Sequence, residues 1–263
     1  MKHLLYLLPL LLTACSTSPD LGPRTDQPPA PAPAPEGVFR YNPNRDSTTV
    51  ALAAQVAEAY GGQEAYDNTR YFKWNFFGVR NLTWDKRAQR ARIEVPSKNE
   101  IYLLDYSTEP YSGKVRLRDR ELTQPDSLQK YLGNAYSMLI NDNYWLVQPF
   151  KLLDPGVRLR MARDAPATDP LKNRPSQAID FTFENVGDTP GNRYRLFIDN
   201  ETQEINTWQF FREAGDAEPA MQTPYDGVEQ YGGLRLSGDR GGRFQLSEIA
   251  VPETVGEEVF TEF

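Results

Sequence analysis

The chain has 263 residues, of which 39% are hydrophobic and 25% are charged, with 29 Lys and Arg against 36 Asp and Glu. Such a length and composition are typical of one large or two small globular domains with a substantial hydrophobic core. The net charge of −7 argues against a nucleic-acid-binding protein, because no basic excess is present to neutralise phosphates.

The N-terminus reads as an export signal. Residues 1–14 combine a basic start at Lys2 with an apolar run over 4–12, which is too short to span a membrane. Leu12-Thr13-Ala14-Cys15 resembles the bacterial lipobox, in which the cysteine receives a diacylglyceryl group. We therefore expect Cys15 to be lipidated and to anchor the protein in the bacterial envelope, most simply at the outer membrane, on its periplasmic face or at the cell surface. The alternative is a plain signal peptide with an incidental cysteine.

A proline-rich tether follows the anchor. Residues 28–35 alternate Pro with Ala after the first proline pair, which favours an extended polyproline II spacer of about 25 Å. We expect residues 15–37 to hold the body clear of the membrane. Residues 38–263 show no repeat and no internal boundary, so they are interpreted as a single domain.

A helix followed by a strand begins this domain. Residues 47–60 carry apolar side chains at helical spacing, and Gly61-Gly62 should end the helix. A short helical turn is expected at 63–67. From Arg70 the pattern changes to period two, which places Phe72, Trp74 and Phe76 on one face of a strand. These residues share one buried surface.

Further strands and one more helix fill the rest of the domain. The helix should begin at Pro125 and run to about Ile140, with its apolar residues in one stripe. The strand-like runs are 79–85, 89–95, 100–106, 114–119, 157–162, 177–185, 193–199, 205–212, 231–237 and 244–251. Their connections are short, so the strands should form an antiparallel meander. We expect a mainly β fold, a curved antiparallel unclosed half-barrel of about 10–11 strands, with two main helices covering its open side.

Aromatic residues are abundant in these strands, with 13 Phe, 14 Tyr and 4 Trp in the chain. Inside a curved sheet they could line a site for an acyl chain or another apolar ligand. The candidates for this lining are Trp74, Phe76, Tyr102, Phe181, Phe183, Tyr194, Trp208 and Phe210. The alternative is an aromatic-rich core filled by its own side chains, and the sequence does not separate the two.

The chemistry that is missing narrows the function further. His3 and Cys15 are the only histidine and cysteine, so processing would leave a body without imidazole. Ser-His-Asp and Cys-His catalysis and Cys/His zinc sites are then excluded. The sequence contains no phosphate loop or dinucleotide fingerprint. We expect no catalytic residue, no metal and no cofactor. Asp199-Asn200-Glu201 is interpreted as a hairpin turn rather than a calcium ligand set.

Paired carboxylates are the remaining catalytic option, as in glycan hydrolases. The strand acids are Glu94, Glu100, Asp105, Asp180 and Glu184. Each is expected instead on the solvent side of its strand, because Asp180, for example, alternates with apolar neighbours. Arg116, Arg118 and Arg120 also alternate; they could meet an anionic head group, although a solvated basic stripe is the simpler interpretation.

Several short stretches carry a family resemblance. They are Ala59-Tyr60-Gly61-Gly62, Tyr144-Trp145-Leu146, Pro149-Phe150-Lys151-Leu152-Leu153-Asp154-Pro155-Gly156 and Tyr225-Asp226-Gly227-Val228. With the lipobox, the tether and the order of elements, the chain resembles the LolA/LolB-type lipoprotein-localisation superfamily, and more closely Bacteroidetes-type envelope lipoproteins. This resemblance implies an unclosed barrel with a helical lid that binds acyl chains. In LolB-like proteins, lipidation marks the membrane-anchored acceptor rather than a soluble carrier.

The sequence therefore predicts a membrane-anchored envelope lipoprotein that binds a lipid or acyl chain in a half-barrel cavity, in contact with the membrane through its anchor and with no nucleic-acid partner. Two alternatives stay open. One is a surface scaffold or interaction module with a filled core. The other is a carboxylate-based glycan hydrolase.

Overall fold

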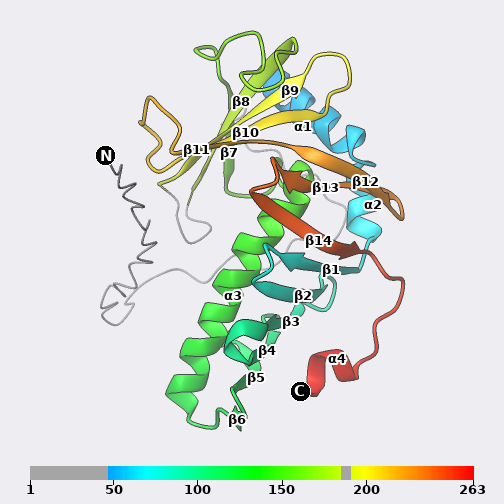
Figure 1. Cartoon of the computed structure of the whole chain (residues 1–263), viewed down its shortest axis with the longest axis vertical. Coiled ribbons are helices and arrows are strands. Elements are labelled where there is room, and N and C mark those ends of the chain that lie inside the picture. The colour runs from blue at the N-terminus through cyan, green and yellow to red at the C-terminus, as the bar shows by residue number, and fades with distance from the viewer. Residues whose placement is uncertain (1–46, 185–190) are drawn as a thin grey trace, which may run out of the picture. The chain divides into compact units, whose positions relative to one another are not determined.

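The computed structural model describes residues 47–184 and 191–263 (Figure 1). The chain divides into Met1–Pro35 and Glu36–Phe263, and every described residue belongs to the second unit. The predicted signal peptide, the lipidated Cys15 and the tether over 15–37 lie outside the described residues. Within the second unit the strands form two antiparallel sheets.

The larger sheet has nine strands in the order β12-β13-β14-β1-β2-β3-β4-β5-β6. The strands are β1 (Tyr71–Phe76), β2 (Arg80–Asp85), β3 (Arg90–Val95), β4 (Glu100–Asp105), β5 (Ser112–Leu117), β6 (Arg120–Glu121), β12 (Asp226–Tyr231), β13 (Leu234–Arg240) and β14 (Phe244–Ala250). Strands β1 to β6 form the expected meander, because each strand pairs with the strand that follows it in the sequence. The C-terminal strand β14 pairs with β1, so the two ends of the domain meet in one sheet.

The smaller sheet has five strands in the order β11-β10-β9-β8-β7. They are β7 (Val157–Met161), β8 (Ser176–Phe183), β9 (Arg193–Asp199), β10 (Ile205–Phe211) and β11 (Met221–Pro224). The chain passes from this sheet to the larger one through Tyr225, between β11 and β12. The Tyr225 ring is buried and packs edge-on against Tyr60, 5.9 Å away.

Helices cover the sheets. The long α3 (Pro125–Val147) packs against β3, β4, β5 and β13, and Figure 1 shows it running along the larger sheet. Helix α1 (Ser47–Ala59) packs against β7 and the 3-10 turn Gln148–Phe150, and α2 (Gln63–Asn68) follows it. The short α4 (Glu258–Thr261) lies on β3 and β4, where it meets Arg90 and Arg92. None of the described helices is long and apolar enough to cross a membrane.

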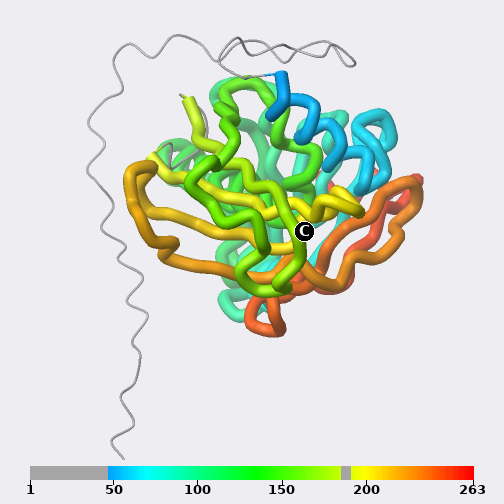
Figure 2. Tube along the Cα trace, turned by 90° about the horizontal axis from the view of Figure 1, so that it is seen from above, coloured from blue at the N-terminus to red at the C-terminus, as the bar shows by residue number. Residues whose placement is uncertain are grey.

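One large hydrophobic core joins the two sheets, α1 and α3. Phe72, Trp74 and Phe76 all lie on its side of β1 with 5% exposure or less, as the alternation predicted. Burial of this many apolar side chains is the main force that stabilises the fold. Figure 2 shows the chain from above, with α1 (blue) beside the strands of the smaller sheet (yellow to orange).

The predicted class, mainly β, antiparallel and unclosed with two main helices, is confirmed. The structure differs in detail, because the strands of the described residues divide between two sheets and number 14 rather than 10–11. Helix α3 continues to Val147 instead of ending near Ile140, since Leu146 and Val147 extend its buried face. Strands β6, β11 and β12 and helix α4 were not predicted.

Candidate functional site

Ten aromatic side chains form one continuous cluster across α3 and both sheets. This aromatic cluster consists of Phe76, Phe77, Tyr144, Trp145, Phe181, Phe183, Tyr194, Trp208, Phe210 and Phe244. Neighbouring ring centroids lie 3.9–6.4 Å apart. Apart from the closer Phe76–Phe77 pair, these distances fall in the range of about 4.5–7 Å that aromatic pairs favour. Trp145 of α3 connects the two sheets, since its ring lies 4.7 Å from Trp208 of β10 and 4.9 Å from Phe77.

The cluster is open to solvent along part of its length. Phe76, Phe181 and Trp208 are buried, with 5% exposure or less. The other seven rings are half-buried: Phe77, Tyr144, Trp145, Phe183, Tyr194, Phe210 and Phe244. These half-buried rings adjoin one another and give the cluster a partly accessible apolar edge, which makes it the candidate binding surface.

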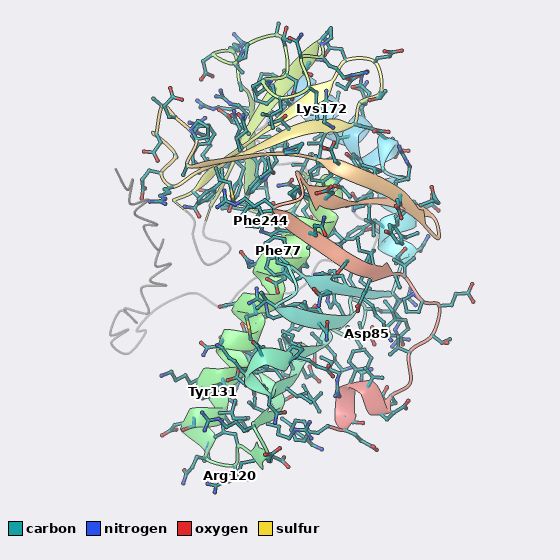
Figure 3. The ribbon with its side chains drawn as sticks, viewed as in Figure 1. Phe77, Asp85, Arg120, Tyr131, Lys172 and Phe244 are labelled. Atoms are coloured by element: carbon teal, nitrogen blue, oxygen red, sulfur yellow. The ribbon has the colours of Figure 1, made fainter. Side chains whose placement is uncertain are left out.

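Two hairpin turns bring their aromatic residues together at one end of the cluster. Phe77 follows β1, and Phe244 begins β14 after the β13–β14 turn. The Phe77 amide donates to the Gln245 carbonyl at 3.0 Å, and the two phenyl rings lie 5.1 Å apart. Figure 3 shows both residues beside the middle of α3. This contact joins segments more than 160 residues apart because β1 and β14 pair.

The turn after β1 is strained in a way that exposes apolar surface. Phe77 has φ = 55°, in the left-handed region that a bulky side chain rarely adopts. The next residues are Gly78 and Val79, and Val79 is 44% exposed. A residue held in an unfavourable backbone conformation is a pointer to function when it also presents an accessible group.

Three arginines lie at this end of the cluster: Arg80, Arg240 and Arg243. The guanidinium groups of Arg80 and Arg240 are hydrogen-bonded to other groups of the protein. Arg80 holds Asp142 of α3 through two bonds, Nε to Oδ2 at 2.6 Å and Nη2 to Oδ1 at 2.8 Å. Burial raises the pKa of the Asp142 carboxyl, and the bonds from Arg80 and Asn141 oppose that rise. Arg80 also lies over the Phe76 ring, at 4.8 Å.

Arg240 is buried, at 2% exposure, behind Trp145. Its Nη2 donates to the Trp145 carbonyl at 2.8 Å, its Nη1 bonds Ser237, and its guanidinium lies 3.8 Å from the centre of the Tyr225 ring. Burial lowers the pKa of Arg240, although the Tyr225 and Tyr60 hydroxyls oppose this. Arg240 therefore ties the C-terminal end of α3 to β13.

Arg243 differs from both. It is exposed, its guanidinium lies over the Phe244 ring at 4.9 Å, and it makes no ion pair within residues 47–184 and 191–263. Among the three arginines of this region, Arg243 is the one whose donors are available to a ligand.

The structure brings together six of the eight predicted ligand residues. Phe76, Phe181, Phe183, Tyr194, Trp208 and Phe210 belong to the aromatic cluster. Trp74 is buried in the core, and among the described residues its ring makes no contact with the cluster and its indole nitrogen finds no hydrogen-bond acceptor. Tyr102 lies farther along the larger sheet, where its hydroxyl donates to Glu100 and its ring faces Tyr131.

Four members of the cluster were missed by the sequence reasoning: Phe77, Tyr144, Trp145 and Phe244. Tyr144 and Trp145 lie beyond the predicted end of the second helix, although they stand in one of the stretches that carry the family resemblance. Phe77 lies in a turn, where period-two alternation gives no signal, and Phe244 is the first residue of its strand.

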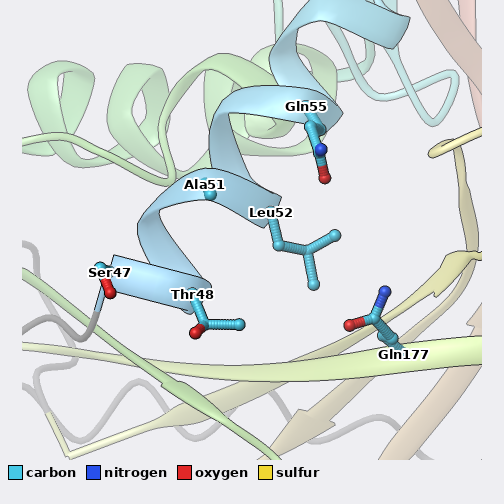
Figure 4. A pocket seen from close by; sticks show the side chains of 6 residues that line it. All are labelled: Ser47, Thr48, Ala51, Leu52, Gln55 and Gln177. Carbon is cyan, nitrogen blue, oxygen red and sulfur yellow. The ribbon is translucent and has the colours of Figure 1, made fainter.

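Two of the pockets in the described part of the chain lie away from the rings of the aromatic cluster. One, of about 430 Å³, lies between α1 and β8 (Figure 4). Gln55 and Gln177 point into it from the two elements beside Leu52, so its lining is half polar. The other, of about 270 Å³, lies between β4, β5 and α4. The rings of the cluster instead contact one another, so an acyl chain would lie against them or displace them.

The candidate catalytic acids are each engaged with nearby groups. Arg92 bonds Glu94, Arg158 bonds Glu184, and Ser107 donates to Asp105 at 2.6 Å. These contacts join single carboxylates to cations or hydroxyls, and none of them brings two of the predicted acids together.

Asp180 corrects the expectation of a solvated strand acid. It lies on the outer face of β8 but is 1% exposed, because the segments after β7 and β10 cover that face. Arg160, Arg193 and Arg195 all bond its carboxylate, with Arg195 Nε at 2.7 Å. A buried charge needs such partners, so this is a structural ion cluster.

Asp199-Asn200-Glu201 forms the predicted hairpin turn. Asp199 Oδ1 accepts the amides of Glu201 and Thr202, and Arg174 bonds its other oxygen. The Arg174 bond holds the pKa of Asp199 well below its usual value. Within the described residues no group of three or more His, Cys, Asp or Glu side chains could hold a metal ion.

Comparison with known proteins gives similarities at the level of outline. No family model matches the sequence, and no curated protein matches it. Among solved structures, a DUF1329 family protein from Desulfovibrio piger matches with 10% identity and a TM-score of 0.42, over 82% of this chain and 98% of the other. A domain described as that of an outer membrane lipoprotein-sorting protein from Vibrio parahaemolyticus matches with 6% identity and a TM-score of 0.40, over 81% and 96%.

MucB matches with 14% identity and a TM-score of 0.27, over 83% of this chain and 64% of its own. None of the three likenesses reaches a TM-score of 0.5. These low TM-scores limit the likeness to the general outline of the fold.

Proposed function

We propose that this protein is a lipid-anchored lipoprotein of the bacterial envelope that binds an acyl chain on the aromatic cluster. The observation that carries the proposal is the continuity of ten rings, seven of them half-buried, across α3 and both sheets. Aromatic faces offer a large apolar contact area, and burial of an acyl chain against them contributes about 0.8 kcal/mol per CH₂ group.

The role is binding rather than catalysis. The body has no histidine, and the strand acids bond nearby cations or hydroxyls. The lipobox supports the anchor at Cys15, and the outer membrane is its proposed location. Labelled palmitate should be incorporated into the wild-type chain and not into Cys15→Ser; incorporation into both would contradict the anchor.

A binding experiment tests the acyl-chain site. The full chain carrying Cys15→Ser keeps every other residue but lacks acyl chains of its own that would compete. A fluorescent fatty acid should bind this chain and be displaced by hexadecanoate. Phe244→Ala should weaken binding by about tenfold, since it removes a half-exposed ring of the cluster.

Tyr131→Ala is the matched control. Tyr131 is also a half-buried aromatic residue, but it lies on α3 near its other end, by Tyr102 and away from the cluster (Figure 3). Its loss should leave the affinity unchanged. Absence of binding to the parent chain, or equal weakening by both substitutions, would contradict a site at the aromatic cluster.

A second candidate is an interaction module that presents the same aromatic cluster to a partner protein. It is favoured by the close contacts of the rings with one another, and the two pockets described above do not lie among these rings. This alternative predicts no uptake of the fluorescent fatty acid, together with crosslinks from photoreactive groups placed at Val79 to a specific envelope protein.

A further inference from the structure

We infer that Arg243 binds the anionic head group of the ligand, and that the ligand is therefore a long-chain carboxylate rather than a neutral lipid. This inference rests on the proposed acyl-chain site and adds the charge of its head group. Three features of the described residues carry it: the position of Arg243, its free donors and the engagement of the cations around it.

The β13–β14 turn fixes Arg243 at the edge of the cluster. Gly241 and Gly242 have φ values of 74° and 72°, which glycine adopts without strain. The Gly242 amide also donates to Asp239 Oδ1 at 2.6 Å, which closes the turn. Arg240 and Phe244 face each other across the hairpin, so Arg243 directly precedes the first ring of the cluster.

The guanidinium of Arg243 is oriented by the Phe244 ring but not neutralised. Stacking at 4.9 Å from the ring centre leaves the edge of the guanidinium, which carries its N–H donors, free to bond a ligand. In the described part of the chain no carboxylate pairs with it. The nearest acid in sequence, Asp239, accepts the Gly242 amide instead.

The neighbouring arginines cannot take this role. Arg80 is held in two bonds by the buried Asp142, and Arg240 is buried and bonded to backbone carbonyls. A ligand anion at this edge would therefore meet Arg243 as its accessible cation. The planar fork of a guanidinium matches the two oxygens of a carboxylate.

The arrangement also suits an amphiphile as a whole. From Phe244 the rings continue through Trp145 and Trp208 to Tyr194 and Phe210, in steps of 4.7–5.8 Å. A head group at Arg243 would stay hydrated, which avoids the cost of burying its charge, while its chain follows the rings.

The test uses two probes with the same chain and dansyl group, of which one has a charged and the other a neutral head group: 11-(dansylamino)undecanoic acid and its methyl ester. The full Cys15→Ser chain should bind the acid about fivefold or more tightly than the ester, since an exposed charge-assisted bond is of modest strength. Arg243→Gln should remove this preference by weakening the binding of the acid to the level of the ester. Arg120→Gln changes an exposed arginine of β6, at the far end of the sheet, and should keep the preference (Figure 3).

The outcomes separate the inference from the proposed function. Equal binding of acid and ester by the parent chain would overturn the role of Arg243 and leave the acyl-chain site standing. A preference that survives in Arg243→Gln would overturn it as well. Failure of both probes to bind would overturn the acyl-chain site itself.

Discussion

Among the phenylalanine rings of the described residues that carry an arginine on their face, Phe211 and Phe244 have opposite surroundings. On the outer face of the smaller sheet, Arg193 lies 3.6 Å from the centre of the Phe211 ring, is buried and bonds Asp180. At the edge of the aromatic cluster, Arg243 lies 4.9 Å from the centre of the Phe244 ring, is exposed and has no ion pair in the described residues.

The difference in burial and pairing assigns Arg193 to the stability of the fold and Arg243 to ligand binding. A buried arginine must be neutralised and hydrogen-bonded, so its removal damages the fold. An exposed and unpaired arginine contributes little to stability, so a defined position beside an apolar surface leaves it available to a ligand. The comparison predicts that substitutions in the first pair change unfolding, and substitutions in the second change binding.

The largest effect is expected at Asp180. Asp180→Asn removes the carboxylate that three arginines share, and should lower the free energy of unfolding by about 3–5 kcal/mol, because buried cations lose their counter-charge. Urea unfolding measures this. Asp164→Asn is the control: its side chain is 70% exposed and pairs with Arg195, so it should cost under about 1 kcal/mol. Equal costs would contradict the comparison.

Arg240→Gln should cost less, about 1–3 kcal/mol, since it leaves the Trp145 carbonyl without its buried donor. The same substitution displaces the end of α3 that carries Trp145, so the near-ultraviolet circular dichroism of the tryptophans should change with it. An Arg240→Gln chain that unfolds at the parent urea concentration would show that this arginine is not structural.

The stability of the protein in acid tests the ion pairs of Asp85 with Arg70 and Arg90. Burial raises the pKa of Asp85, but the bonds from Arg70, the Ala88 amide and Arg90 outweigh it, so the net pKa is lowered. Such a group stabilises the fold above its unfolded pKa of about 4, and this contribution is lost as the pH falls through its folded pKa. Stability should therefore decrease below about pH 4 and less steeply in Asp85→Asn. Identical slopes would contradict the assignment.

Phe77→Gly should leave the free energy of unfolding within about 1 kcal/mol of the parent, because relief of the left-handed strain offsets the lost ring contacts. The affinity for the fluorescent fatty acid should nevertheless fall. Val79→Ser in the same turn keeps Phe77 and should weaken binding less. A large loss of stability in Phe77→Gly would mean that the ring supports the fold rather than a ligand.

The smallest effect on stability is expected for Arg243→Gln, within about 0.5 kcal/mol, since it changes an exposed side chain without an ion pair in the described residues. Thermal unfolding of this chain should overlay that of Arg120→Gln. A clear loss of stability in Arg243→Gln alone would show that Arg243, like Arg193, supports the fold.

The fold was predictable from the sequence because its strands alternate. Period two assigned Phe72, Trp74 and Phe76 to one buried face, and short turns required antiparallel pairing. Alternation also placed Asp180 opposite the apolar face of β8. It could not show that later segments cover that outer face, because both faces of a strand can be buried by chain that is distant in sequence.

The site was predictable in part for the same reason. Seven of its ten rings lie on strands, and six of these seven were identified as apolar candidates. Phe77 meets Phe244 through the pairing of β1 with β14, and Trp145 joins them from a helix that extends past its predicted end. Contacts between distant segments carry no local pattern, and the free donors of Arg243 follow from what lies around it in space.

The most direct test of the central claim uses the tryptophans of the cluster. A fatty acid brominated along its chain quenches the emission of tryptophans that it contacts. In the full Cys15→Ser chain it should quench strongly, and the double substitution Trp145→Phe, Trp208→Phe should remove most of the quenching while Trp74 and Trp84 still emit. Quenching that persists unchanged in the double variant, or none in the parent chain, would contradict an acyl-chain site on the aromatic cluster.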